Sequence, residues 1–202
     1  MKRINIAILA SGNGSNFEAI VNAAKRGYIK ASVKVLITNK EKAFVRTRAK
    51  RNKLKDIFID PSNFKSRIEF DREITRILKK EKIELVILAG FMRILSAEFV
   101  KKFKNRILNI HPALLPAFRG ENAIERALKH GCKVTGVTVH LIDEKVDNGP
   151  IILQQAVKIE RGETLKNLEK KVHNLEHKLY PLAVKLFVER RVKIRNRNVE
   201  II

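Results

Sequence analysis

An asparagine and a histidine two residues apart, Asn109 and His111, are the side chains best suited to do chemistry. They lie in the stretch Asn-Ile-His-Pro, residues 109–112, which follows an apolar segment. If that segment is a strand, both side chains project to the same side. The amide of Asn109 can donate hydrogen bonds, and the imidazole of His111 can donate and also change protonation near neutral pH. Together they could stabilise an oxyanion, although this stretch alone is more simply explained by a hydrogen-bonded loop histidine.

A carboxylate, Asp147, begins the turn-forming stretch Asp-Asn-Gly-Pro at residues 147–150. Taken alone, such an aspartate is most often a turn residue whose side chain bonds its own backbone. His140 lies among apolar strand residues and could support a site indirectly. The histidines outside the Asn-Ile-His-Pro stretch are first interpreted as structural: His130, His140, His173 and His177.

A glycine-rich loop, Ser11-Gly12-Asn13-Gly14-Ser15-Asn16, follows the first apolar segment. Glycines let the backbone approach a ligand, and the free N–H groups and dipole at a helix start favour an anion. A dinucleotide fingerprint would need a glycine at Phe17 and an acid near Asn39, and the Gly-Lys-Ser/Thr of a P-loop is missing. The loop therefore favours a monophosphate. A capping box of Ser15 and Glu18 would explain it structurally, and the two interpretations can coexist.

The bulk composition limits the class of protein. The chain has 202 residues, of which 45% are hydrophobic, enough for a packed core. Cys132 is the single cysteine, so no intrachain disulfide can form and a cytoplasmic location is expected. The longest apolar run, Leu85–Met92, is far shorter than the ~20 residues that span a bilayer, so no membrane association is expected.

The net charge of +22 could indicate a polyanionic partner such as RNA. The basic residues, however, are scattered along the predicted helices. The densest stretch, Arg190–Arg197, has no interleaved aromatic residues of the kind that stack on bases. A solvated basic surface without a specific nucleic-acid partner is the favoured interpretation.

The elements that must position these residues alternate between strand and helix in the first half of the chain. Apolar, β-rich segments predict four strands, and 3.6-residue periodicity or composition predicts the helices between them. Such alternation is typical of a doubly wound, mostly parallel α/β sheet, with a Rossmann-like N-terminal half. The predicted strands are Ile4–Leu9, Val33–Thr38, Asp56–Ile59 and Leu85–Ala89, and the helices are Ser15–Arg26, Ala43–Arg51 and Ser66–Lys80.

The second half of the chain predicts antiparallel strands that extend the sheet and a long C-terminal helix. The antiparallel strands are predicted over Val134–Ile142 and Ile151–Ile159, after a short strand over Ile107–Ile110. A helix is predicted over Asn122–Lys129 and another over Thr164–Glu189. The leucines of the last helix recur at spacings of three and four, so a coiled coil must be considered. Pro181 would kink or interrupt a long coil, which favours one face docked on the sheet.

Six motifs occur in an order that resembles the phosphoribosylglycinamide formyltransferases, a family of folate-dependent enzymes of purine synthesis. They are SGNGSN (11–16), LAGFMRIL (88–95), LNIHPALLP (108–116), TGVTVH (135–140), the Asp147 turn (147–150) and EHKLYP (176–181). The Asn-x-His with Leu-Leu-Pro is shared by several formyl-folate enzymes, whereas SGNGSN and the length distinguish this family. The resemblance implies one formyltransferase domain over 1–202, with a phosphate or nucleotide half (1–103) and a folate and catalytic half (104–202).

The resemblance also implies the roles of individual residues. Asn109, His111 and Asp147 match the catalytic trio, with protonated His111 and the Asn109 amide stabilising an oxyanion and Asp147 favouring the charged imidazole. Glu176 matches the carboxylate that holds the ribose hydroxyls of glycinamide ribonucleotide. The matching phosphate-loop residues are Gly14, Ser15 and Asn16. The matching residues on the side of the co-substrate, 10-formyltetrahydrofolate, are Arg67, Met92, Arg93, Ile94 and Leu95, together with Asn109. No metal ion is implied, and either a monomer or a homodimer is compatible with the sequence.

Alternative functions share part of this pattern. The catalytic half of a methionyl-tRNA formyltransferase uses the same chemistry, and an RNA substrate would explain the charge. Against it, no C-terminal RNA-binding domain is expected from this sequence, and SGNGSN suits a small phosphate. A formyl-folate hydrolase and a basic RNA-binding module are further alternatives. One loop departs from the family pattern at Arg119-Gly120, where relatives usually have Pro-Gly, so its detail is open.

Overall fold

The computed structural model describes residues 3–202, which form two compact units that divide between Leu108 and Asn109. Strand order in the seven-stranded sheet is β3-β2-β1-β4-β5-β6-β7. The first unit contains the first four of these strands, and β5 (Ile107–His111) begins in it and ends in the second. The predicted fold class, a mostly parallel sheet extended by antiparallel strands, is confirmed.

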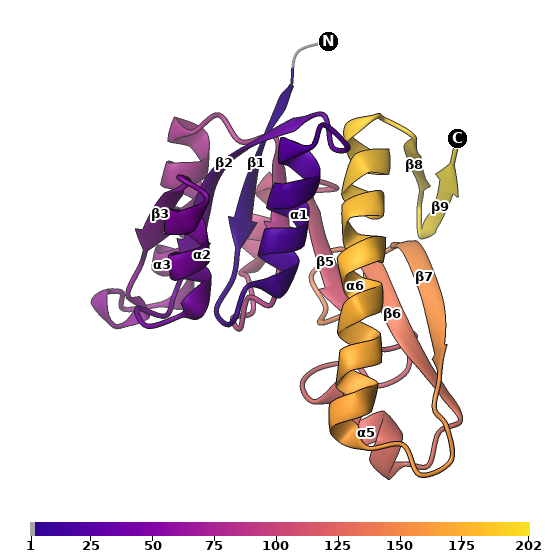
Figure 1. Ribbon diagram of the computed structural model, residues 1–202. Coiled ribbons are helices and arrows are strands. Elements are labelled where there is room, and N and C mark those ends of the chain that lie inside the picture. Colours follow the sequence, from indigo (N-terminus) through magenta and orange to yellow (C-terminus); the bar gives the residue numbers. More distant parts are fainter. Residues whose placement is uncertain (1–2) are drawn as a thin grey trace. The chain divides into compact units, whose positions relative to one another are not determined.

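The first unit is built on parallel strands. β1 (Ile4–Leu9) pairs on one side with β2 (Ala31–Thr38) and on the other with β4 (Leu85–Leu88), and β2 pairs with β3 (Lys55–Phe58). The central strands are almost wholly apolar and buried, as expected where helices cover both faces of a parallel sheet. The helices are α1 (Ser15–Lys25), α2 (Phe44–Arg51), α3 (Arg67–Lys80) and α4 (Ala97–Lys102), with a short 3-10 turn, η1 (Pro61–Asn63) (Figure 1).

The second unit is antiparallel, as the sequence predicts. β6 (Val134–Leu141) pairs with β7 (Ile151–Lys158), and α5 (Ala123–Lys129) precedes them. The long helix α6 (Leu165–Val188) packs on β6, β7 and α5 (Figure 1). The expectation that one face of this helix docks on the sheet is therefore confirmed. Pro181 lies buried inside α6 and does not end it.

Three features differ from the sequence prediction. Helix α4 and the hairpin of β8 (Val192–Arg195) and β9 (Asn198–Ile201) were not predicted, because both segments are short and rich in charge. The basic stretch 190–197 is thus largely a strand and a turn. The predicted capping box is wrong: α1 starts at Ser15, and its N-cap is Gly14, with a left-handed φ of 80° and no side-chain cap.

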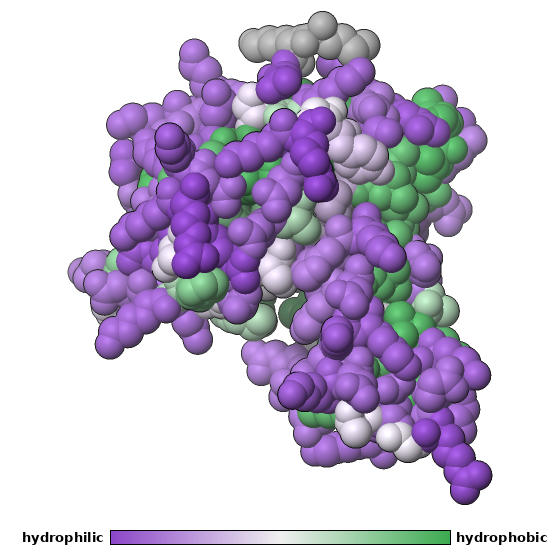
Figure 2. Space-filling model, viewed as in Figure 1, coloured by the Kyte–Doolittle hydropathy of each residue, from purple (hydrophilic) through white to green (hydrophobic). Residues whose placement is uncertain are grey.

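Hydrophilic residues cover most of the face shown in Figure 2. Among residues 3–202, no helix is both long enough and apolar enough to cross a bilayer.

The excess positive charge predicts a weak interaction with RNA. Scattered cations exchange for the counterions of a polyanion without reading its sequence, so we expect affinity to fall by about 100-fold or more between about 50 and 200 mM salt. Fluorescence anisotropy with a tRNA and a length-matched random RNA would measure this. Tight binding that prefers the tRNA at physiological salt would contradict the prediction.

Candidate functional site

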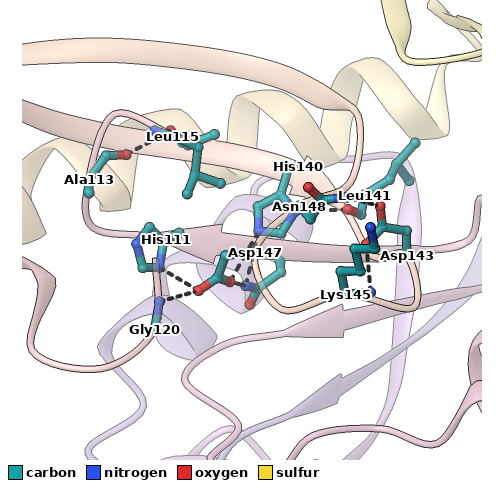
Figure 3. Close-up of polar contacts among 12 residues, drawn as sticks. His111, Ala113, Leu115, Gly120, His140, Leu141, Asp143, Lys145, Asp147 and Asn148 are labelled. Carbon is teal, nitrogen blue, oxygen red and sulfur yellow. Dashed lines mark hydrogen bonds and ion pairs between the residues drawn. The ribbon is translucent and has the colours of Figure 1, made fainter. Parts of the chain in front are cut away.

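The carboxylate of Asp147 brings together the residues that the sequence analysis singled out in the second unit (Figure 3). Its Oδ2 lies 3.2 Å from Nδ1 of His111, and its Oδ1 accepts a hydrogen bond from Nδ2 of Asn109 at 3.3 Å. The backbone N–H of Gly120 donates to Oδ2 at 2.9 Å. One buried carboxylate therefore holds the two strand side chains and the loop that departs from the family pattern.

The turn that carries Asp147 is held by its backbone geometry and by Asp143, and not by the side chain of Asp147. Asp147 has a φ of 45°, in the left-handed region that few non-glycine residues adopt. Gly149 lies so close to the end of β6 that a Cβ there would lie 1.9 Å from the carbonyl oxygen of Leu141. Asp143 accepts bonds from the N–H of Lys145 and from the Asn148 side chain. The loop is thus closed against β6, and the Asp147 carboxylate is directed toward β5.

His140, on β6, also belongs to this cluster. The sequence analysis had suggested only that His140 could support a site indirectly. It is fully buried, and its Nδ1 lies 2.8 Å from the carbonyl oxygen of Leu141. A carbonyl only accepts, so we assign the proton to Nδ1. Its Nε2 then faces Nδ2 of Asn109 at 3.2 Å as an acceptor. Both amide hydrogens of Asn109 therefore face protein groups, one on Asp147 and one on His140, which fixes the orientation of the amide.

Both ring nitrogens of His111 face acceptors. Nδ1 faces Asp147, and Nε2 lies 2.9 Å from the backbone carbonyl of Phe118. A neutral imidazole has a single N–H, so it can satisfy only one of these acceptors, whereas a protonated ring satisfies both. The geometry therefore favours uptake of a proton by His111. Nε2, the nitrogen that does not face Asp147, is in contact with the Phe118 carbonyl.

Burial opposes that protonation. Burial lowers the pKa of His111, and this outweighs the opposite effects of the Asp147 charge and the Phe118 carbonyl. Burial alone would raise the pKa of Asp147, but the Gly120 N–H, which donates to its Oδ2, and the other polar groups around the carboxylate leave the pKa lowered overall. At neutral pH the resting pair is then a neutral imidazole beside an ionised carboxylate.

The predicted glycine loop lies at the carboxyl end of β1 in the first unit, the edge at which ligands bind open α/β sheets. It leads directly into α1, whose first N–H groups have no partners within the helix. A Cβ on Gly14 would lie 2.4 Å from Cγ2 of Val45, so only glycine fits there. These properties agree with an anion-binding loop.

Apart from Arg67, the predicted folate-side residues of the first unit follow the carboxyl end of the neighbouring strand β4. Met92 and Ile94 are each 60% exposed, and the guanidinium of Arg93 stacks on the ring of Phe70 at 4.5 Å. The other two residues of this set are a buried Leu95 and Arg67, the first residue of α3. Exposed apolar side chains beside a cation suit a flat, anionic co-substrate.

Ser11 joins the two loops of the first unit. Its hydroxyl accepts a hydrogen bond from the N–H of Met92 at 2.8 Å and donates one to Oδ1 of Asn39 at 2.5 Å. The serine is nearly fully buried, so both bonds are sheltered from water. The sequence analysis had placed Ser11 in the glycine loop without giving it this role.

Glu176, on α6, is 4% exposed and has a partner that the sequence analysis did not identify. Its Oε2 lies 2.9 Å from Nδ1 of His173, one helical turn away, and this bond raises the pKa of His173. The negative charge of Glu176 also acts to raise the pKa of His111. Among residues 3–202 no group of three or more His, Cys, Asp or Glu side chains is arranged to hold a metal ion.

Comparison with known proteins finds a matching family and similar sequences. A profile of the family described as formyl transferase matches residues 4–184. The chain is 41% identical over 179 residues to phosphoribosylglycinamide formyltransferase of Bacillus subtilis, covering 89% of this chain and 92% of that protein. It is 42% identical over 193 residues to the human trifunctional purine biosynthetic protein adenosine-3, covering 96% of this chain and spanning only 19% of that protein.

A solved structure is similar over the whole chain. Glycinamide ribonucleotide transformylase 1 of Symbiobacterium toebii superposes with a TM-score of 0.97 at 42% sequence identity. The match covers 100% of this chain and 95% of that one.

Proposed function

The chain belongs to the phosphoribosylglycinamide formyltransferases, and we propose that Asn109, His111 and Asp147 carry out its reaction. The enzyme transfers a formyl group to the amine of glycinamide ribonucleotide in purine biosynthesis. The proposed donor is 10-formyltetrahydrofolate, and the proposed location is the cytoplasm, in keeping with the single cysteine. The observation that carries the assignment is the Asp147 carboxylate, which contacts both other members of the trio.

The chemistry forms one C–N bond and breaks another. The amine attacks the formyl carbon, giving a tetrahedral intermediate with an oxyanion, and the bond from that carbon to the folate nitrogen then breaks. A proton must leave the attacking amine, and a proton must reach the leaving nitrogen. We assign this transfer to Nε2 of His111, which first exchanges its contact with the Phe118 carbonyl for the substrate.

Asp147 gives the imidazole its capacity to accept that proton. When His111 becomes charged, the ionised carboxylate 3.2 Å from Nδ1 stabilises the new charge. Asn109 is held by Asp147 and His140 and is proposed to lie beside the oxyanion, for which one of its N–H groups exchanges its protein acceptor. The proposed chemistry requires no metal ion, because these donors and the imidazolium supply the stabilisation.

Binding roles are proposed for the remaining predicted residues. Gly14, Ser15 and Asn16 bind the substrate phosphate through N–H groups at the start of α1. Glu176 accepts hydrogen bonds from the ribose hydroxyls. Arg67 and the 92–95 loop contact the folate. The predicted halves, 1–103 and 104–202, remain a proposed division of these roles.

A two-substrate assay tests the activity directly. Purified enzyme, 10-formyltetrahydrofolate and glycinamide ribonucleotide should together produce deformylated folate at a rate that depends on both substrates. Release of formate without the ribonucleotide would indicate a hydrolase, and activity with methionyl-tRNA alone would indicate the alternative transferase.

The phosphate loop makes a second prediction. Gly14→Ala places a methyl group against Val45 and requires a φ that alanine disfavours, so the loop must shift. We expect the KM for glycinamide ribonucleotide to rise by about tenfold or more, as for loss of one or two charge-assisted hydrogen bonds. The KM for folate should change little.

Gly12→Ala is the matched control, because a Cβ at Gly12 meets no atom within 4 Å. It should leave both Michaelis constants close to those of the wild type. Equal increases in the two constants for Gly14→Ala would mean that the loop only starts the helix and does not bind phosphate.

A further inference from the structure

An arginine outside the predicted site, Arg48 on α2, bonds both the glycine loop and the helix that follows it. Its Nε donates to the backbone carbonyl of Asn13 at 2.9 Å, and its Nη2 donates to the side-chain Oδ1 of the same residue at 2.9 Å. Its Nη1 forms an ion pair with Glu18 on α1. One guanidinium therefore ties the loop to the helix that follows it.

A second contact from α2 acts on the preceding peptide of the loop. The N–H of Val45 donates to the carbonyl of Gly12 at 3.1 Å. The same valine is the residue that a Cβ on Gly14 would strike. Helix α2 thus holds two successive carbonyls of the loop, those of Gly12 and Asn13, and packs against the next residue.

These two bonds determine where the loop N–H groups point. In a trans peptide the C=O of one residue and the N–H of the next point in opposite directions. With the carbonyls of Gly12 and Asn13 held on α2, the N–H groups of Asn13 and Gly14 are turned away from α2. Successive N–H groups turned to one side form a concavity that binds anions.

We propose that Arg48 is a positioning residue for substrate phosphate, because it orients the N–H groups of the glycine loop while its own charge is engaged by Glu18. This rests on the proposed role of the Gly14–Asn16 loop. The side chain of Arg48 is 19% exposed, and its planar fork meets both oxygens of Asn13 at once. A lysine has one ammonium on a flexible stem and cannot make the same set of bonds.

The test compares Arg48→Gln and Arg48→Lys with the wild type in steady-state assays. We expect both substitutions to raise the KM for glycinamide ribonucleotide by about tenfold, while kcat and the KM for folate stay within about twofold. Arg51→Gln is the matched control, because it removes one charge from the same helix at an exposed residue whose described contact is with the Phe44 ring. It should behave as the wild type does.

Two further measurements separate the possible outcomes. The dephosphorylated substrate, glycinamide riboside, should react equally well with wild type and Arg48→Gln, because the lost contact concerns only the phosphate. Asn13→Ala should weaken phosphate binding less than Arg48→Gln, and the double variant should be no worse than Arg48→Gln alone.

Restoration of the KM by Arg48→Lys would show that charge alone suffices and would overturn the positioning role. An unchanged KM in Arg48→Gln would also overturn it, provided that the wild type still discriminates between ribonucleotide and riboside. If the wild type itself does not discriminate between these two substrates, the proposed phosphate role of the loop is what fails.

Discussion

Replacing His111 with asparagine is expected to lower kcat by about 10³-fold, within the range of a lost general acid–base group. Asparagine retains a neutral donor of similar reach but can neither accept nor release a proton. The ring is 4% exposed and is held between Asp147 and the Phe118 carbonyl, so its position in the site is well defined. Both Michaelis constants should stay within a few-fold of the wild type, since the assigned role concerns proton transfer rather than binding.

Pre-steady-state mixing with both substrates would measure the chemical step separately from product release. His130→Asn is a control for loss of a histidine outside the cluster, because His130 is exposed at the end of α5 and contacts the Phe118 ring. A His111→Asn enzyme with kcat within about tenfold of the wild type would remove His111 from the proton pathway.

The second large effect is expected for Asp147→Asn. The amide can still accept a bond from Gly120 but no longer carries the charge that stabilises a protonated His111. We expect kcat to fall by about 10²-fold or more, in keeping with removal of a charged partner from a buried site. Because Asp147 acts through His111, the double variant should be little worse than His111→Asn alone.

Circular dichroism and the two Michaelis constants would establish that the loop has kept its form. Asp143→Asn is the matched control, since Asp143 holds the same loop through Lys145 and Asn148 but does not contact His111. Full additivity of the His111 and Asp147 losses would show that the two residues act independently.

The sequence predicted the elements well where periodicity is strong. The bounds of β1, α3 and α6 lie within one or two residues of prediction, because buried apolar runs and amphipathic faces are local properties. The start of α1 at Ser15 was predicted correctly, but its cap was not: Ser15 and Glu18 fit a capping box in sequence, whereas the N-cap is a left-handed Gly14. The preference of glycine for positive φ is visible in sequence, but the packing of Val45 that requires it is not.

Some contacts of the site could be predicted from the sequence and others could not. The spacing of Asn109 and His111 on one strand predicts that their side chains share a face, and the resemblance adds Asp147. The contacts of Asp147 with His140 and Gly120 join residues that are separate in sequence, and no local pattern encodes them. The same holds for Arg48, which the sequence shows only as one of 43 basic residues.

The most direct test of the His111–Asp147 pair is the pH dependence of kcat/KM in the wild type and in Asp147→Asn. The scheme requires a neutral imidazole in the free enzyme, so kcat/KM should fall on the acidic side as His111 becomes protonated. Loss of the Asp147 charge removes an interaction that raises the pKa of His111, so the acidic limb should move to lower pH. An acidic limb at the same pH in both enzymes, or one that moves to higher pH, would contradict the proposed pairing of His111 with Asp147.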